Sequence, residues 1–232
     1  DPGVCMTFPG TIPIQGGVME SINPRLDFAR ALHLINDEVG FQNSEECKVH
    51  ASAQISKSAI IGKGVGIGEG TIVGANVVLA DGVQIGSHCI LKSNSVIGED
   101  GFGFERDENE NPIRLPHLGG VVIEDHVEIG SLCTVCRGTI ENTIIKEHVK
   151  IDDHVHVAHN VFIGEKTMIT ACVEISGGVS IGSNVWIGPN ASIKDQLKIG
   201  SHSFVGIASN VTKDVQEHSS VAGNPARKLM QS

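Results

Sequence analysis

The sequence predicts an all-β solenoid preceded by one short helix. Aliphatic side chains recur every six residues along most of the 232-residue chain. The longest unbroken series is Ile145, Ile151, Val157, Ile163, Ile169, Ile175, Ile181, Ile187, Ile193, Ile199, Val205 and Val211. An earlier series of the same period runs from Val49 to Ile97, and a shorter one from Ile123 to Val135 lies between them. A fixed short period indicates stacked repeats, and it outweighs local propensity.

Each six-residue unit predicts one short strand and a corner. The reference aliphatic is often followed by glycine, as in Ile61-Gly62, and a small or branched residue often stands two positions before it, as Val65 does before Ile67. Because a strand alternates faces with period two, both residues point inward, and glycine permits the turn. Three such strands close an 18-residue coil, and coils stack about 4.8 Å apart. Roughly 23 units therefore predict seven to eight coils.

Residues 1–47 predict an irregular lead segment followed by a capping helix. The first 22 residues are rich in Pro and Gly, which favours irregular structure. Asn23-Pro24 then supplies an N-cap and a proline at the first helical position. Apolar residues follow at helical spacing, which predicts a helix over residues 24–36 that packs on the open first coil. The chain begins at Asp1 rather than Met, which suggests that upstream sequence was removed or lies outside it.

We expect the β-helix to span residues 48–215, with two interruptions. The six-residue spacing is lost near residues 99–120, which hold a polar run and the aromatics Phe102 and Phe104, and again near residues 136–144. Interruptions in a solenoid are extruded loops that commonly shape the binding face. Residues 216–232 follow the last repeat, and we expect them to form a C-terminal tail.

The composition fits this architecture and limits the partners. The chain has 28 Gly, seven Phe, one Trp and no Tyr, which suits a narrow aliphatic core. A net charge of −10 argues against nucleic acid as a partner, because no basic stripe is available to neutralise phosphates. No segment is long and apolar enough to span a membrane, and no signal peptide is present. We therefore expect a soluble, cytoplasmic protein.

The six cysteines do not predict a metal site. Cys133 and Cys136 form a lone C-x-x-C without a second pair, so neither zinc-finger nor redox spacing is met. Small buried thiols in a reducing cytosol are the favoured interpretation. We expect no bound metal and no tightly bound cofactor.

Reactive groups must come from outward side chains, because the core is aliphatic. The densest cluster of them is the segment 152–160, which contains three of the eleven histidines. His159 lies two residues past the inward Val157, so its ring should point outward at a corner. One 18-residue coil places the Gly177 backbone N–H about 5 Å away along the stack. A neutral imidazole and a backbone donor suit acyl transfer to an amine, although surface histidines without a catalytic role are the alternative on composition alone.

Several motifs resemble the UDP-3-O-acylglucosamine N-acyltransferases of lipid A synthesis. They are Gly98-Glu-Asp-Gly-Phe-Gly-Phe104, Leu115-Pro-His-Leu-Gly119, Val127-Glu-Ile-Gly130, Arg137-Gly138, Ile151-Asp-Asp-His-Val-His-Val-Ala-His-Asn-Val161 and Ile163-Gly164. The resemblance covers about residues 18 to 200. It implies a left-handed parallel β-helix of hexapeptide repeats, assembled as a homotrimer with active sites between neighbouring subunits.

The resemblance implies roles for particular residues. His159 matches the catalytic base of that family, Gly177 matches its oxyanion-donating amide, and Asp152 matches a carboxylate near the sugar. The residues expected to bind the substrate are Asp152, Asp153, His156, Asn160, Phe102, Phe104 and Gln196.

The chain also departs from the family pattern. Asp153 stands where the family usually has Asn, Gln196 replaces a second histidine, and Cys136 replaces the Asp before Arg-Gly. We also expect the family's large N-terminal nucleotide-contacting domain to be reduced to a short segment, and its C-terminal helices that engage acyl carrier protein to be missing. These departures concern the substrate and the donor more than the reaction type.

The C-terminal tail predicts a donor site. The segment 221–228 is similar to the tail of hexapeptide acyltransferases that use acyl-CoA, in which the end of the solenoid borders the CoA groove. Arg227 and Lys228 would there meet phosphates through charge-assisted bonds. A terminal cap with exposed basic residues is an equally good interpretation of this segment.

The leading hypothesis is an N-acyltransferase that moves an acyl group from acyl-CoA or acyl carrier protein to the amine of a nucleotide-linked amino sugar. Lipid A or surface polysaccharide synthesis would be the setting. One alternative is a metalloenzyme like the γ-class carbonic anhydrases, with His154, His156 and His159 as zinc ligands. Another is a noncatalytic solenoid scaffold, which Gln196 and Cys136 favour.

Overall fold

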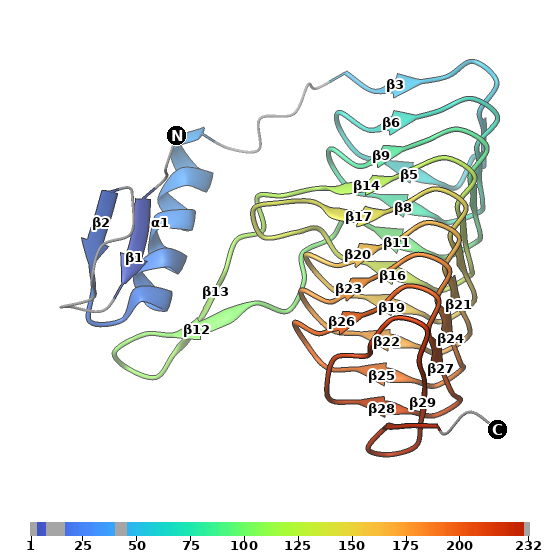
Figure 1. Cartoon of the computed structure of the whole chain (residues 1–232). Helices are drawn as coiled ribbons and strands as arrows, with labels where there is room; N and C mark the ends of the chain where they lie inside the picture. Colours follow the sequence, from blue (N-terminus) through green and yellow to red (C-terminus); the bar gives the residue numbers. More distant parts are fainter. Residues whose placement is uncertain (1–3, 8–16, 40–45, 230–232) are drawn as a thin grey trace. The chain divides into compact units, whose positions relative to one another are not determined.

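A computed structural model describes residues 4–7, 17–39 and 46–229, and it divides the chain into two compact units (Figure 1). Unit 1 comprises residues 1–42 and 102–118, and unit 2 comprises residues 43–101 and 119–232. The larger unit 2 contains the repeats. Each unit is described by itself below.

Unit 2 is a parallel β-helix with three faces, each a sheet of very short strands. The first face contains β3 (Lys48–Val49), β6 (Gly66–Ile67), β9 (Gln84–Ile85), β14 (Val121–Ile123), β17 (Thr143–Ile145), β20 (Phe162–Ile163), β23 (Ser180–Ile181) and β26 (Lys198–Ile199). The second face contains β4 (Gln54–Ile55), β7 (Ile72–Val73), β10 (Ile90–Leu91), β15 (Glu128–Ile129), β18 (Lys150–Ile151), β21 (Met168–Ile169), β24 (Trp186–Ile187), β27 (Phe204–Val205), β29 (Ser220–Ala222) and β30 (Arg227–Lys228). The third face contains β5 (Ile60–Ile61), β8 (Val78–Leu79), β11 (Val96–Ile97), β16 (Thr134–Val135), β19 (His156–Val157), β22 (Glu174–Ile175), β25 (Ser192–Ile193) and β28 (Asn210–Val211).

The strand register confirms the 18-residue coil. Ile163 pairs with Ile181, and Val157 pairs with Ile175, so each ladder residue stands over its equivalent in the next coil. Within the described residues, the first and third faces have eight strands each, which makes eight complete coils. The predicted number of seven to eight coils is confirmed.

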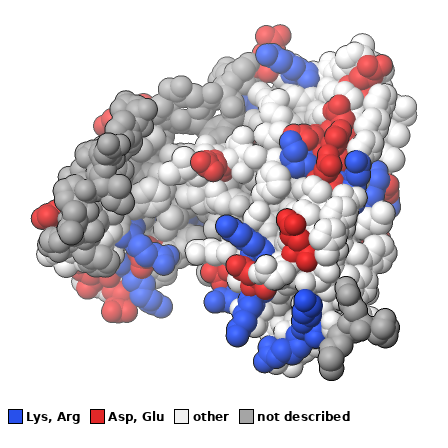
Figure 2. All heavy atoms as spheres, viewed as in Figure 1, with Lys and Arg blue, Asp and Glu red and all other residues white. Residues whose placement is uncertain are grey.

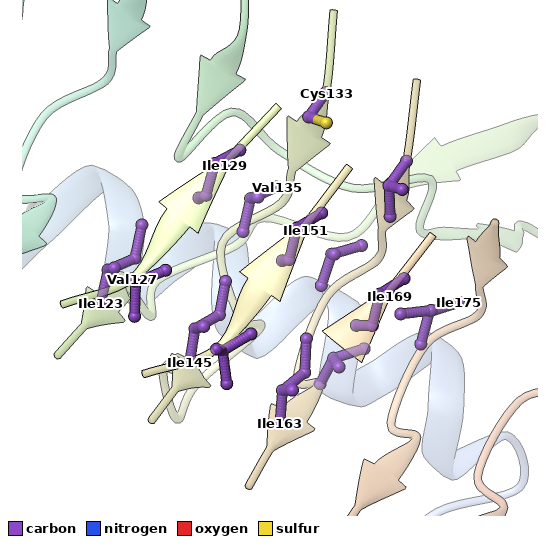
Figure 3. Close-up of a cluster of buried hydrophobic side chains, with 14 of the residues drawn as sticks. Ile123, Val127, Ile129, Cys133, Val135, Ile145, Ile151, Ile163, Ile169 and Ile175 are labelled. Carbon is purple, nitrogen blue, oxygen red and sulfur yellow. The ribbon is translucent and has the colours of Figure 1, made fainter. Parts of the chain in front are cut away.

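The aliphatic ladder forms the core. Ile123, Ile145 and Ile163, from successive coils of the first face, all point inward in Figure 3 and are almost completely buried. Cys133 is buried in the same core. Burying one such aliphatic side chain contributes about 1.5–3 kcal/mol, so stability accumulates coil by coil.

Burial also settles the chemistry of the C-x-x-C pair. It raises the pKa of the Cys133 thiol and of the Cys136 thiol to about 11. Both thiols are therefore protonated at neutral pH, and a reactive thiolate is not formed.

Both interruptions of the repeat leave the stack intact. β16 pairs with β19 across 22 residues instead of 18, because residues 136–142 are extruded between β16 and β17. The buried Arg137 guanidinium holds this segment: its Nε donates to the Gly98 carbonyl oxygen (2.5 Å) and its Nη2 to that of Asp81 (2.8 Å). Arg137 therefore joins the second interruption, by hydrogen bonds, to Gly98, the residue just before the first interruption.

The β-helix extends past the predicted end at residue 215. β29 continues the second face in parallel with β27, with Val221 paired to Val205, and β30 then folds back antiparallel. The pairing of Val221 with Val205 spans fewer residues than a regular coil, so the six-residue ladder did not reveal it. Residues 216–222 are thus part of the stack rather than a tail.

Unit 1 contains α1 (Pro24–Val39), the parallel pair β1 (Val4–Thr7) and β2 (Gly17–Glu20), and the hairpin β12 (Phe104–Arg106) and β13 (Pro112–Arg114). Asn23 caps the helix, since its Oδ1 accepts from the Leu26 N–H (3.2 Å), which confirms the predicted start. The expected irregular lead segment was wrong for β1 and β2. Two four-residue strands give little periodic signal, and their pairing is nonlocal.

The helix packs within unit 1. Its buried residues Leu26, Ala29 and Leu32 form the predicted apolar stripe, and the helix contacts β1 and β12. Arg30 reaches both carboxylate oxygens of Glu108 (2.8 and 2.7 Å). The helix thus packs against strands of its own unit, and its expected packing on the first coil stays a prediction. Within the described residues, no helix is long and apolar enough to cross a membrane.

Candidate active site

His159 stands at the corner where the chain leaves β19 and turns into β20. The next two coils repeat this corner, and backbone hydrogen bonds join the three levels: Gly178 N–H donates to the His159 carbonyl oxygen (2.9 Å), and Gln196 N–H donates to that of Gly177 (2.9 Å). Asn160, Gly178 and Gln196 all adopt a positive φ, of 58°, 70° and 59°. The structure thus brings His159, Gly177 and Gln196 into one column.

The His159 ring lies directly over Gly177. A Cβ built on Gly177 would lie 2.7 Å from both Cε1 and Nε2 of His159, closer than any side chain allows. Among the described residues, no acceptor is bonded to the Gly177 N–H. The column therefore offers an imidazole nitrogen and an available backbone donor side by side, as the 18-residue period predicted.

Asn160 fixes the orientation of His159. Its Oδ1 lies 3.0 Å from His159 Nδ1 and also accepts from the Thr139 N–H (3.1 Å) and hydroxyl (3.0 Å). Its Nδ2 donates to the Glu141 carbonyl oxygen (3.3 Å). Because an amide oxygen only accepts, Nδ1 of neutral His159 carries the proton and the lone pair lies on Nε2. Asn160 thus sets the tautomer of His159. Its hydrogen bonds to Thr139 and Glu141 also hold the second interruption next to this corner.

His156 lies beside this corner on the third face. Its Nδ1 is 2.6 Å from the Thr134 hydroxyl oxygen, and its ring is half-buried. Burial lowers the pKa of His156 more than the nearby Glu174 carboxylate raises it. The ring is therefore neutral at neutral pH and can exchange hydrogen bonds with a bound ligand.

Asp152 and Asp153 lie at the other end of β19, at the preceding corner, so the structure does not bring them to His159 within one chain. Asp153 Oδ1 accepts from the Ser131 N–H (2.7 Å) in the preceding coil. Asp81 and Asp125 make the same kind of bond to a backbone N–H of the coil before. Asp153 therefore supports a corner, whereas Asp152 is exposed.

Phe102 and Phe104 belong to unit 1. Their rings lie 4.9 Å apart, and the Arg114 guanidinium carbon lies 4.8 Å from the centre of the Phe104 ring. Phe102 is 89% exposed. Together with Glu105 and Pro112 they line a shallow hollow on the hairpin, which leaves an aromatic surface open to a ligand or a partner.

Arg227 and Lys228 form β30, at the C-terminal end of the β-helix, several coils beyond His159. Both side chains are exposed and line a cavity of about 380 Å³ together with Lys213 and Val221. Figure 2 shows basic side chains gathered over the C-terminal coils on the face in view. The predicted donor residues therefore line the same basic cavity. Within one chain, His159 is not among the residues that line it.

The three histidines of segment 152–160 lie at three different positions around the coil. His154 is at the preceding corner, His156 on the third face and His159 at the following corner. Among residues 4–7, 17–39 and 46–229, no three His, Cys, Asp or Glu side chains are grouped as metal ligands. The arrangement within one chain gives no support to the carbonic anhydrase alternative.

The sequence analysis missed Glu174 and Thr139. Glu174 is one coil of 18 residues after His156 and pairs with it in register. Applying the coil length to His156, as to His159, would have found it. Thr139 lies in the second interruption, where the period no longer gives positions.

The repeats themselves identify the architecture. The model of the bacterial transferase hexapeptide (six repeats) matches residues 64–99 and 178–206. These two segments make up less than a third of the chain. In fold, this chain is similar to UDP-N-acetylglucosamine acyltransferase from Campylobacter jejuni, with a TM-score of 0.63 and 21% identity over 78% of this chain and 74% of that one. The likeness confirms the predicted left-handed parallel β-helix.

Curated relatives share shorter segments with this chain at higher identity. UDP-3-O-acylglucosamine N-acyltransferase from Pseudoalteromonas translucida is 49% identical over 76 residues, which are 33% of this chain and 22% of that protein. The enzyme of the same name from Francisella tularensis is 57% identical over 68 residues, 29% of this chain and 20% of that protein. The chain therefore spans about a fifth of the length of these relatives.

Proposed function

We propose that this chain is an N-acyltransferase that moves an acyl group from a thioester to the amine of a nucleotide-linked amino sugar. The observation that carries the proposal is the His159 ring held over Gly177 with its lone pair on Nε2. The names of the relatives, UDP-3-O-acylglucosamine N-acyltransferase, support the same substrate class. Lipid A or surface polysaccharide synthesis is the corresponding setting.

The proposed reaction uses two groups of the column. The acceptor amine attacks the thioester carbonyl carbon while His159 Nε2 accepts a proton from the nitrogen. The Gly177 N–H donates to the oxyanion of the tetrahedral intermediate. The C–S bond then breaks, and the imidazolium returns the proton to the departing thiolate. One amide and one free thiol are formed, and His159 is regenerated.

The remaining predicted residues enter the proposal around this column. His156, Asn160 and Gln196 lie at or beside it and would contact the acceptor. Asp152, Asp153, Phe102 and Phe104 would contribute from a neighbouring subunit of a homotrimer, with the active sites between subunits. Arg227 and Lys228 would bind the phosphates of acyl-CoA, which we prefer to acyl carrier protein as the donor.

A free-thiol release assay tests the proposed function. The purified chain is incubated with acetyl-CoA or 3-hydroxyacyl donors, each crossed with UDP- and dTDP-linked amino sugars. We expect thiol release that requires both a donor and an amino sugar. Release with acyl carrier protein thioesters alone would move the donor assignment away from CoA, and no release with any pair would contradict the proposed function.

Replacing Asn160 by alanine is expected to lower kcat by about 10-fold or more, because His159 loses the contact that orients it. Asn160→Asp keeps an acceptor for Nδ1, so it should retain more activity. Its negative charge favours the protonated imidazole, which cannot act as a base. The rise of kcat on the acidic side of the pH profile should therefore move to higher pH. The pH dependence of kcat for the three proteins checks this. An alanine variant with the wild-type profile would show that Asn160 does not position His159.

A further inference from the structure

A line of polar side chains runs beside the candidate active site on the third face. It consists of Thr134, His156, Glu174 and Ser192, the outward residues of β16, β19, β22 and β25, which pair in register from coil to coil. Glu174 is the acidic member of this polar line. It lies on β22, three residues before Gly177, and its carboxylate is hydrogen-bonded to the hydroxyl of Ser176, the residue that precedes Gly177.

Glu174 is half-buried and, unlike Glu124 and Glu128, forms no ion pair with a Lys or Arg of the described residues. Glu124 pairs with Lys146, and Glu128 pairs with Lys92 at 2.8 Å. Both Glu174 oxygens instead accept from the Ser176 hydroxyl, at 3.0 and 3.2 Å. Among the described residues, no Lys or Arg forms an ion pair with Glu174. A partly desolvated carboxylate without a cation is costly, and a cationic ligand would offset this cost.

The neighbouring histidine does not neutralise this charge. His156 pairs with Glu174 in the strand register, but burial keeps the pKa of His156 below its ordinary value. The imidazole is therefore uncharged at neutral pH. The polar line consequently presents a net negative charge next to the His159 corner, with neutral hydrogen-bonding groups on both sides of it.

We infer that Glu174 is a specificity-determining residue that binds the acceptor amine in its ammonium form and so selects amino sugars over their hydroxyl analogues. The inference rests on the proposed function and names a property of the same site. An ammonium group donates charge-assisted hydrogen bonds to a carboxylate, whereas a hydroxyl donates a single neutral one. The bound ammonium loses one proton to solvent, and the resulting amine then attacks as described above.

Binding and kinetic measurements on the full chain test this inference. UDP-glucosamine and UDP-glucose serve as probes, since they differ in an amine and a hydroxyl, and their Kd values are measured calorimetrically for wild type and Glu174→Gln. We expect the wild type to bind UDP-glucosamine at least 10-fold more tightly than UDP-glucose, and Glu174→Gln to lose most of this preference. In thiol release, Glu174→Gln should raise KM about 10-fold or more and change kcat little.

Two further variants make the result specific. Ser176→Ala removes the hydroxyl that orients Glu174 and should weaken the amine preference less than Glu174→Gln does. Glu165→Gln removes an exposed carboxylate at another corner, beside Lys166, and should leave both Kd values unchanged. Equal probe affinities in the wild type, or an unchanged preference in Glu174→Gln, would overturn the inference. Selective binding of UDP-glucosamine without any thiol release would contradict the proposed function alone and leave the role of Glu174 standing.

Discussion

Replacing His159 by alanine is expected to lower acyl-transfer turnover by about 10²-fold or more, because it removes the group that takes the proton from the attacking amine in the proposed reaction. The measurement is kcat for thiol release at saturating donor and acceptor. The free energy of unfolding should change little, since the ring is only half-buried and the core of this coil is formed by Val157 and its neighbours.

His154→Ala is the matched control, because His154 belongs to the same cluster but is exposed at the preceding corner. It should retain wild-type turnover. If His159→Ala kept substantial activity, or if both variants lost activity equally, His159 would be removed from the mechanism.

Replacing Gly177 by alanine should also lower kcat by about 10²-fold. The new Cβ would lie 2.7 Å from Cε1 and Nε2 of His159, so the ring must turn away from its position over the backbone N–H. A displacement of about 1 Å in a reacting group can cost 10²-fold in rate. The backbone of Gly177 does not require a positive φ, so the alanine itself is compatible with the turn.

Thermal melting separates this effect from misfolding. Gly177→Ala should melt close to the wild type, because the atom that must move is the far end of an outward side chain. Gly130→Ala is the contrasting variant, since its Cβ would lie 2.4 Å from the Asp152 carbonyl carbon and must disturb the stacking of two coils. A Gly177→Ala protein with wild-type kcat would show that the close approach of ring and glycine is not used in catalysis.

The regular part of the fold could be predicted because each repeat has the same physical requirement. An inward aliphatic every six residues is needed wherever a coil buries its centre, so the pattern from Ile145 to Val211 predicted strands, corners and coil length together. The same coil length predicts that Gly177 lies one coil away from His159 at the same corner. Asn23 and Pro24 likewise predicted the helix start, since capping is a local property.

Other features depend on contacts that no local pattern records. The pairing of β1 with β2, the packing of α1 against β12, and the short coil that ends at Val221 are nonlocal or break the period. The roles of Asn160 and Glu174 belong to the same class, although the coil length alone could have placed Glu174 beside His156. Their roles follow from the Thr139 and Ser176 hydroxyls and from the neutral state of His156, and these emerge only when the second interruption and the third face are seen in three dimensions.

The central claim is that the His159 column joins an acyl group to an amine, and the reaction product tests it most directly. After incubation with a thioester donor and a nucleotide-linked amino sugar, the sugar product is isolated and its mass and linkage are determined. We predict one acyl group per sugar, attached through an amide to the amine nitrogen, in amounts equal to the thiol released. Thiol release with an unmodified sugar, or with an ester on a hydroxyl group, would contradict the claim.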